Sequence, residues 1–260
     1  MTRRDFFGWT AALSAPSEWF AQVNAFRGQA KLNQVLDACL EGQWRRAPIG
    51  ELVAHVGKSF LGVPYVGSTL EVDVDREYCV VNLDGLDCVT FFESSLAIAR
   101  AVKLWASFER PSTMRPTPQD VLRETTLTRY RGGKIDGYAS RLHYTLDWMR
   151  DNAAKRTVAL PLDGARGSAP LRKTFDFMSK RPELYKQLAH NPERVKAIQA
   201  CEASLNLAKF SYVPTANARA MEAHLLSGDI IGLVMARDGL DISHTGLIVR
   251  EGDKALFMHA

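Results

Sequence analysis

The residues with the clearest chemical potential are a cysteine and two histidines that lie far apart in the chain. Cys88 follows Asp87 in the stretch LDCVTFFE, where a helix is predicted to begin, whereas His244 lies in the predicted strand DISHTGLI. A thiolate at a helix N-terminus is stabilised by the helix dipole and by unpaired backbone N–H groups. A histidine on a rigid strand can take the thiol proton, and a third polar group such as His259 can orient that imidazole. These residue types predict a cysteine hydrolase.

Each of these residues also has an ordinary structural interpretation. A free cysteine is commonly a small buried hydrophobic residue, and a single strand histidine is commonly a surface residue. Local features favour catalysis. Asp87 caps the helix and follows a turn, and the small neighbour Ser243 leaves room for a substrate beside His244. His259 is almost at the chain end, and if this end is frayed, His259 cannot hold the His244 imidazole in one orientation.

The composition is that of an ordinary globular protein. The chain has 260 residues, of which 46% are hydrophobic and 24% charged, so one large domain or two small ones are expected. The net charge of +4 comes from scattered basic pairs, which predict no nucleic-acid partner but allow a modest attraction to anionic cell-wall polymers. No apolar run approaches the ~20 residues that span a bilayer, so no integral membrane segment is predicted.

The N-terminus resembles a twin-arginine export signal. Arg3 and Arg4 precede a short apolar stretch within residues 1–15. This pattern predicts a periplasmic or secreted protein. An amphipathic first helix is the alternative, and a cytoplasmic location stays open.

The remaining cysteines do not form a metal-binding or redox motif. Cys39, Cys79 and Cys201 allow at most one disulfide, and free thiols are predicted for Cys39 and Cys201 because both lie in helical patterns. The chain also lacks an H-E-x-x-H or Walker spacing, so we predict no metal and no cofactor.

Hydrophobic spacing predicts helices followed by an antiparallel meander, and hence an α+β fold. The chain stops within the last predicted strand, which suggests truncation after Ala260. Helices are expected over 19–42 (interrupted at Gly28), 48–61, 88–102, 119–150 (broken by glycines) and 182–208, loops over 110–119 and 164–170, extended segments over 70–74 and 78–83, and strands over 229–235, 243–250 and from 255.

Several stretches, taken in order, resemble the bacterial N-acetylmuramoyl-L-alanine amidase-like family, which is similar to the NlpC/P60 branch of papain-like cysteine peptidases. The matching stretches are LDCVTF, DII, DISHTG and MHA, with support from residues 60–71 and 130–148. The resemblance implies a single domain over 16–260 with a papain-like core, N-terminal helices, a helical insertion over about 104–225 and a C-terminal antiparallel sheet.

The resemblance also assigns roles to individual residues. It implies Cys88 as the nucleophile, His244 as the base and His259 as the orienting residue. Tyr65 matches a Pro-Tyr segment that lines the cleft, and Asp87 matches the acidic residue before the cysteine. The implied substrate is peptidoglycan or a muropeptide.

Two departures from the NlpC/P60 pattern bear on the substrate. Cys88 and His244 are 156 positions apart, much farther than in compact NlpC/P60 domains, so the helical insertion is expected to shape the substrate groove. Val89 occupies a position that is commonly a serine, which helps to bind a free substrate amine. The absence of this serine hydroxyl favours an amidase that cuts between the muramyl lactoyl group and L-Ala, where the nitrogen is acylated.

Two other functions stay open at this stage. One is a γ-D-glutamyl-diamino acid endopeptidase that uses the same nucleophile. The other is a non-catalytic protein that binds the cell wall with an inactive site.

Overall fold

The computed structural model describes residues 26–41, 44–106, 115–160 and 167–260. The predicted export signal and the first part of the predicted helix over 19–42 lie outside the described residues. Within the described ranges, no helix is both long enough and apolar enough to cross a bilayer.

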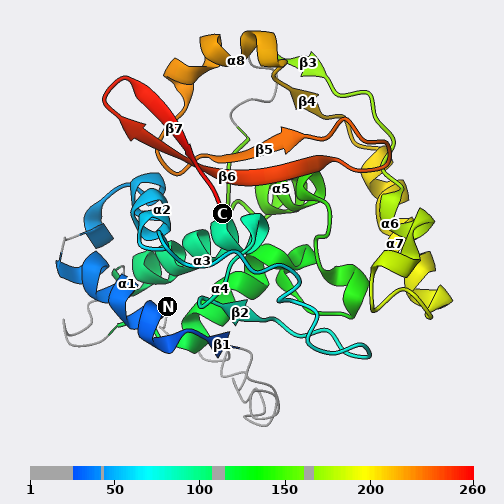
Figure 1. Cartoon of the computed structure of the whole chain (residues 1–260), viewed down its shortest axis with the longest axis horizontal. Helices are drawn as coiled ribbons and strands as arrows, with labels where there is room; N and C mark the ends of the chain where they lie inside the picture. The colour runs from blue at the N-terminus through cyan, green and yellow to red at the C-terminus, as the bar shows by residue number, and fades with distance from the viewer. Residues whose placement is uncertain (1–25, 42–43, 107–114, 161–166) are drawn as a thin grey trace, which may run out of the picture.

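Helices form most of the body, and an antiparallel sheet lies along one side of it (Figure 1). The strands β5 (Ile230–Val234), β6 (Ile242–Glu251) and β7 (Lys254–Met258) form this sheet in that order. Two short pairs also occur: β1 (Phe26–Arg27) is parallel to β2 (Val81–Asn82), and β3 (Ala169–Pro170) is antiparallel to β4 (Ser211–Tyr212). The α-helices are α1 (Gln29–Glu41), α2 (Ile49–Lys58), α3 (Cys88–Ala106), α4 (Pro118–Arg129), α5 (Thr145–Ala154), α6 (Phe177–Lys180), α7 (Pro192–Asn206) and α8 (Thr215–Met221).

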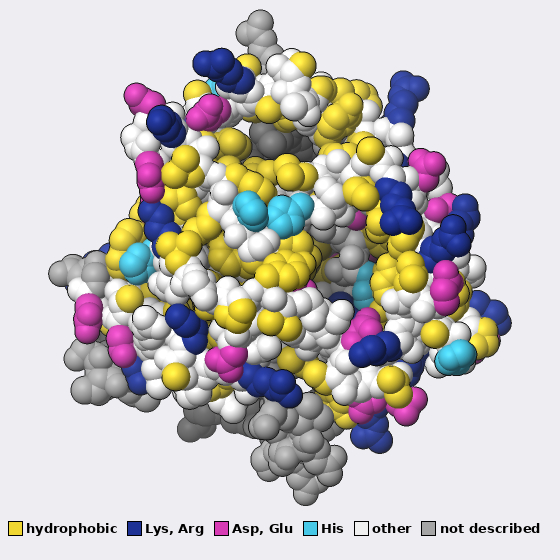
Figure 2. All heavy atoms as spheres, in the orientation of Figure 1, with side chains coloured by type: hydrophobic (Ala, Val, Ile, Leu, Met, Phe, Trp, Pro, Cys, Tyr) yellow, Lys and Arg dark blue, Asp and Glu magenta, His cyan; other side chains and the backbone are white. Residues whose placement is uncertain are grey.

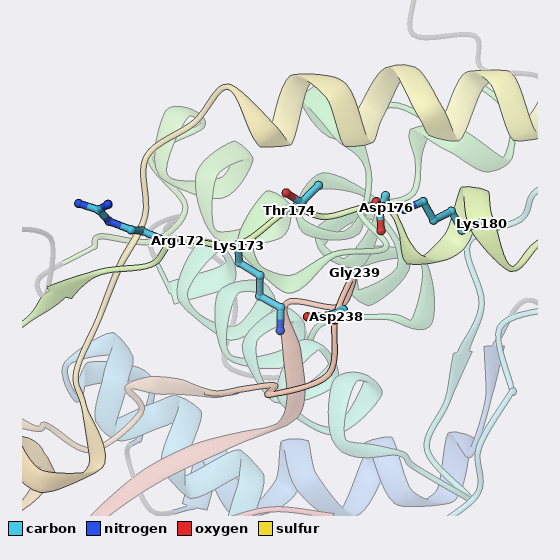
Figure 3. Close-up of a pocket in the computed structure, with 7 residues that line it drawn as sticks. All are labelled: Arg172, Lys173, Thr174, Asp176, Lys180, Asp238 and Gly239. Carbon is cyan, nitrogen blue, oxygen red and sulfur yellow. Dashed lines mark ion pairs between the residues drawn. The ribbon is translucent and has the colours of Figure 1, made fainter.

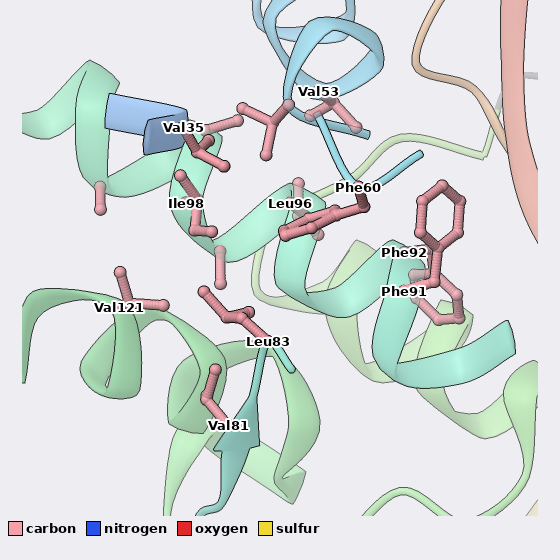
Figure 4. Close-up of a cluster of buried hydrophobic side chains, with 14 of the residues drawn as sticks. Val35, Val53, Phe60, Val81, Leu83, Phe91, Phe92, Leu96, Ile98 and Val121 are labelled. Atoms are coloured by element: carbon pink, nitrogen blue, oxygen red, sulfur yellow. The ribbon is translucent and has the colours of Figure 1, made fainter. Parts of the chain in front are cut away.

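Helix α3 is the central element of the main core. Its side chains are buried almost all round, and Ala97, Ile98 and Ala99 have no exposed surface. Figure 4 shows residues of several other elements gathered around this helix, among them Val53 of α2 and Val121 of α4. A helix that is buried on every side has little freedom to shift, so its first residue, Cys88, has a rigid support.

The meander packs against α2 and α3 through one face of β6. A Cβ atom at Gly57 would lie 2.6 Å from Met258 Cε and 3.0 Å from Leu247 Cδ1, so a larger residue there would require these two side chains to shift. The strand register is Leu247 opposite Met258 in β7 and opposite Ile230 in β5. An irregularity between Leu233 and Val234 of β5 leaves one residue of β6 unpaired there.

The stretch predicted as an insertion contributes to two cores. Helix α4 and Trp148 of α5 belong to the main hydrophobic cluster around α3. Farther along, α6 and α7 belong to a second cluster that includes Phe175, Ile198 and Leu205. The described residues of this stretch therefore pack in both clusters.

Most predicted elements form, and the structure corrects several of them. Leu70–Val74 forms no strand, because Asp73 Oδ1 accepts the backbone N–H groups of Asp75 (2.7 Å) and Arg76 (3.0 Å) and so makes a local turn. Phe26 lies in β1 and not in a helix, since Gly28 takes a φ of +89° and ends the extended segment.

The predicted helix over 182–208 is also divided. Its regular part, α7, begins only at Pro192, and Asn191 caps it by accepting the N–H of Arg194 at 3.0 Å. A proline fits the first turn of a helix but disfavours a helical residue before it, which explains the break. The predicted loop over 110–119 ends earlier than expected, because Thr117 and Asp120 form a capping box that starts α4 at Pro118.

All four cysteines are free thiols in the structure. Cys39 in α1 and Cys79 are buried, whereas Cys88 and Cys201 are half-buried. Burial raises the pKa of Cys39 to about 12, so this thiol stays protonated at physiological pH.

Candidate active site

The N-terminus of α3 is held by Asp87. Its Oδ1 accepts the backbone N–H groups of Val89 at 3.0 Å and Thr90 at 2.7 Å, and its own N–H donates to Thr90 Oγ1 at 2.8 Å. The N–H of Phe91 donates to the Asp87 carbonyl at 2.9 Å. Within the described ranges, the N–H of Cys88 is thus the one donor of the first helical turn that has no partner. This N–H is available for a developing oxyanion.

The sheet meets this helix end through Thr245. Thr245 is buried, with 1% of its surface exposed, and its Oγ1 donates to the carbonyl oxygen of Cys88 at 2.8 Å. The contact joins residues that are 157 positions apart in the sequence. Because His244 directly precedes Thr245, folding brings the strand that carries the predicted base to the predicted nucleophile.

His244 and His259 lie side by side. Their ring centroids are 4.8 Å apart with the planes at 81°, and the ring of Phe257 lies 6.1 Å from His244 and 5.3 Å from His259. Figure 2 shows histidine side chains among hydrophobic ones near the middle of the face that is in view. Strand β7 ends at Met258, so His259 follows the strand and does not lie within it as predicted.

The environment of His244 favours its neutral form. Partial burial lowers the pKa of this imidazole, and the neighbouring charge of His259 lowers it further. A neutral imidazole is the form that accepts a proton. In the described part of the chain, neither the ring nitrogens of His244 nor the Cys88 sulfur has a hydrogen-bond partner. Hydrogen bonds between catalytic groups commonly reach their working geometry only in the substrate complex.

Tyr65 lies next to the nucleophile helix. Its backbone pairs with Leu86 in a parallel bridge that is flanked by two hydrogen bonds of 3.1 Å. The phenol is 64% exposed. Desolvation raises the pKa of its hydroxyl, and the nearby charges of Cys88 and Asp87 raise this pKa further. The structure therefore places Tyr65, Asp87 and Cys88 in one cluster.

Ser243 occupies a different setting. Its side chain is exposed, and its hydroxyl donates to the carbonyl of Leu233 at 3.1 Å, at the irregularity between β5 and β6. The substrate-binding role of Ser243 stays a prediction, and its hydroxyl must leave this bond to donate to a ligand.

Two buried carboxylates lie on elements that carry the site, and their partners could not be predicted from residue types or spacing. Asp241 is buried at the start of β6, and its Oδ2 accepts the backbone N–H of Leu146 at 2.8 Å, which fixes that strand to the first turn of α5. Glu93 lies in α3 and pairs with Arg129 of α4 at 2.7 Å, and both side chains are 2% exposed. Burial raises the pKa of Glu93, and the Arg129 guanidinium opposes this rise.

Thr245 was also missed as a site residue. The available signal was strand alternation, which puts Thr245 on the same face of β6 as the core residue Leu247 and so directs it toward the packed helix. In the described ranges, no group of three or more His, Cys, Asp or Glu side chains converges in a way that could hold a metal ion.

Comparisons with known proteins identify similar chains. Residues 55–260 match the AmiA-like family, described as N-acetylmuramoyl-L-alanine amidase-like. The chain is similar to the crystal structure of an N-acetylmuramoyl-L-alanine amidase from Bacteroides uniformis, with 34% identity, a TM-score of 0.70 and coverage of 81% of this chain and 84% of that one. No curated protein matches the chain significantly.

Two further structures are similar. A Bacteroides fragilis protein whose description proposes a xylanase has 33% identity and a TM-score of 0.66, and the match covers 78% of this chain and 85% of that one. A Legionella pneumophila protein has 16% identity and a TM-score of 0.55, with coverage of 88% and 84%, and shares the fold alone.

Proposed function

Because the chain belongs to the N-acetylmuramoyl-L-alanine amidase-like family, we propose that it is a cysteine amidase that hydrolyses the bond between the muramoyl lactoyl group and L-Ala in bacterial peptidoglycan. The observation that carries this proposal is the 2.8 Å contact between Thr245 Oγ1 and the Cys88 carbonyl, which joins the histidine strand to the cysteine helix. A helix that presents a cysteine to a histidine-bearing antiparallel sheet is also the arrangement expected of a papain-like core.

The proposed reaction has two steps. The Cys88 thiolate attacks the amide carbonyl carbon, and the C–N bond breaks as protonated His244 gives its proton to the leaving L-Ala nitrogen. This leaves a thioester between Cys88 and the lactoyl group. Water then attacks the thioester carbon while His244 takes its proton, which releases the lactoyl carboxylate and restores the thiol.

The negative oxygen that forms in each step needs donors. The N–H groups of Val89 and Thr90 are occupied by Asp87. The backbone N–H of Cys88 is therefore the donor that the helix end supplies, and the exposed Tyr65 hydroxyl beside it is the second candidate. Removing one oxyanion donor from an acyl-transfer enzyme costs about 10²–10³ in kcat.

The site favours amide over glycosidic cleavage. Glycosidases commonly use two carboxyl groups that flank the scissile bond. Asp87, the carboxylate beside Cys88, is instead engaged with two backbone N–H groups and with Thr90 Oγ1. This arrangement supports thiol chemistry, and it argues against glycosidase chemistry at this site.

Digestion of a purified disaccharide tetrapeptide, followed by mass spectrometry, tests the proposal. We expect a free disaccharide and a stem peptide that begins with L-Ala. Cys88→Ala should abolish the reaction, whereas Cys201→Ala, which removes the other half-buried thiol, should leave it unchanged.

The alternatives give different results in the same experiment. An L-Ala-D-Glu dipeptide that stays on the sugar would indicate the γ-D-glutamyl-diamino acid endopeptidase. An unaltered substrate that binds the folded protein would indicate a cell-wall binding protein. Either result would refute the amidase.

A further inference from the structure

A charged cavity lies upstream of the histidine strand, apart from the residues of the candidate active site. It measures about 570 Å³, and its lining consists of Arg172, Lys173, Thr174, Asp176, Lys180 of α6 and the turn at Asp238 and Gly239 (Figure 3). Cavities of this size commonly hold small ligands or parts of larger ones.

The walls of this cavity are joined by backbone contacts. The N–H groups of Asp176 and Phe177 both donate to the Gly239 carbonyl at 3.2 Å. Gly239 takes a φ of +80°, and a Cβ there would lie 2.8 Å from Asp176 Oδ1, so only glycine fits this turn. The turn is therefore fixed to the segment that carries Lys173, Asp176 and Lys180.

The cavity presents separate positive and negative groups. Lys180 is paired with Asp176 at 2.7 Å and is neutralised. Lys173 Nζ donates to the Met235 carbonyl, which uses one of its three N–H bonds. Within the described ranges, Lys173 and Asp238 have no ion-pair partner within 4.0 Å, and both line the same cavity.

The cavity lies within reach of a bound stem peptide. Gly239 precedes His244 by five residues, so their Cα atoms are at most about 17 Å apart. Three extended residues of a stem peptide span about 10 Å from the scissile amide, and the side chain of the third residue adds to this length. The separation between His244 and the cavity is therefore one that the third residue of a stem peptide, with its side chain, can span.

We propose that this cavity binds the side chain of a diamino acid at the third position of the stem peptide, recognising its free α-amino carboxylate. The proposal rests on the amidase function. Lys173 would bind the carboxylate of the side-chain terminus, as in diaminopimelate, and Asp238 would bind its ammonium group. An unpaired cation and an unpaired carboxylate in one cavity are complementary to such a zwitterion.

Three muropeptides that differ only at this side chain test the proposal. The first carries diaminopimelate with a free side-chain terminus, the second carries lysine, which lacks the carboxylate, and the third carries diaminopimelate with an acetylated side-chain amine. We expect kcat/KM to fall about fivefold when either charge is removed, since each lost pair in a solvated site is worth up to about 1 kcal/mol.

Substitutions separate the two charges. Asp238→Asn should raise KM about fivefold for the first substrate with little change in kcat, and should leave the acetylated substrate unaffected. Lys173→Met should reduce the preference for diaminopimelate over lysine. Asp253→Asn, an exposed acid in the β6–β7 turn, is the matched control and should behave as the wild type.

The possible results are distinguishable. Equal cleavage of all three substrates by the wild type would overturn the recognition while leaving the amidase intact. A uniform effect of Asp238→Asn on all three substrates would also overturn it, because the residue would then act on folding or on the whole site. If none of the three substrates is cleaved at the amide bond, the amidase function and the recognition of the diamino acid are refuted together.

Discussion

Replacing Thr245 with valine should damage catalysis far more than stability. The substitution keeps the shape of a side chain that is 1% exposed and removes the 2.8 Å hydrogen bond to the Cys88 carbonyl. A neutral intramolecular hydrogen bond contributes about 0.5–1.5 kcal/mol. We therefore expect the free energy of unfolding to fall by about 1 kcal/mol.

The effect on activity follows from position. This bond joins the residue after His244 to the first residue of α3, so its loss frees the strand to move relative to the nucleophile. A displacement of about 1 Å in an active site can reduce the rate about 10²-fold. We expect kcat/KM for a disaccharide tetrapeptide to fall by about 10- to 100-fold, and alkylation of the Cys88 thiol to continue.

Thr125→Val provides the matched control. Thr125 is also fully buried, and its Oγ1 donates to a backbone carbonyl, that of Val121, at 2.9 Å, but the bond stays within α4. Urea denaturation measures the stability of both variants, and muropeptide turnover measures their activity. The reasoning is refuted if Thr245→Val keeps wild-type kcat/KM, or if the two variants lose activity equally.

Three other perturbations probe separate parts of the site. The charge of His259 lowers the pKa of His244, so His259→Asn should move the acidic limb of the pH profile of kcat/KM toward higher pH; an unmoved or lowered limb would contradict the coupling. Glu93→Gln leaves Arg129 buried without its counter-charge and should cost about 3–5 kcal/mol in urea denaturation, and a loss below 1 kcal/mol would show that the pair is not needed. Because burial raises the pKa of Cys39 to about 12, iodoacetamide should label this thiol only after unfolding, and labelling of the native protein, read by peptide mass spectrometry, would show that α1 opens readily.

The sequence predicted the elements whose local chemistry is unambiguous. Asp87 as a helix cap placed the start of α3 correctly, and the alternating C-terminal segment predicted β5, β6 and β7. Local patterns failed where a side chain competed with the expected element. Leu70–Val74 has the alternation of a strand, but the carboxylate of Asp73 bonds the following N–H groups and turns the chain.

The assembly of the site depends on long-range contacts that a single sequence does not encode visibly. Residue types indicated Cys88, His244 and His259, and the structure brings the two histidines into ring contact. The hydroxyl of Thr245 and the buried carboxylate of Asp241 could not be assigned, because their partners are a carbonyl and an N–H that every residue has. Nor could spacing reveal that Cys88 keeps the one unpaired N–H of the first helical turn.

The most direct test of thiol catalysis is to trap the intermediate. The folded protein is mixed with a disaccharide tetrapeptide, quenched in acid within the first turnover and digested for mass spectrometry. We predict that the peptide containing Cys88 carries the disaccharide lactoyl group as a thioester, and that His244→Ala reduces this adduct together with turnover. Continued release of stem peptide by Cys88→Ala, with no adduct on the wild-type cysteine, would contradict it.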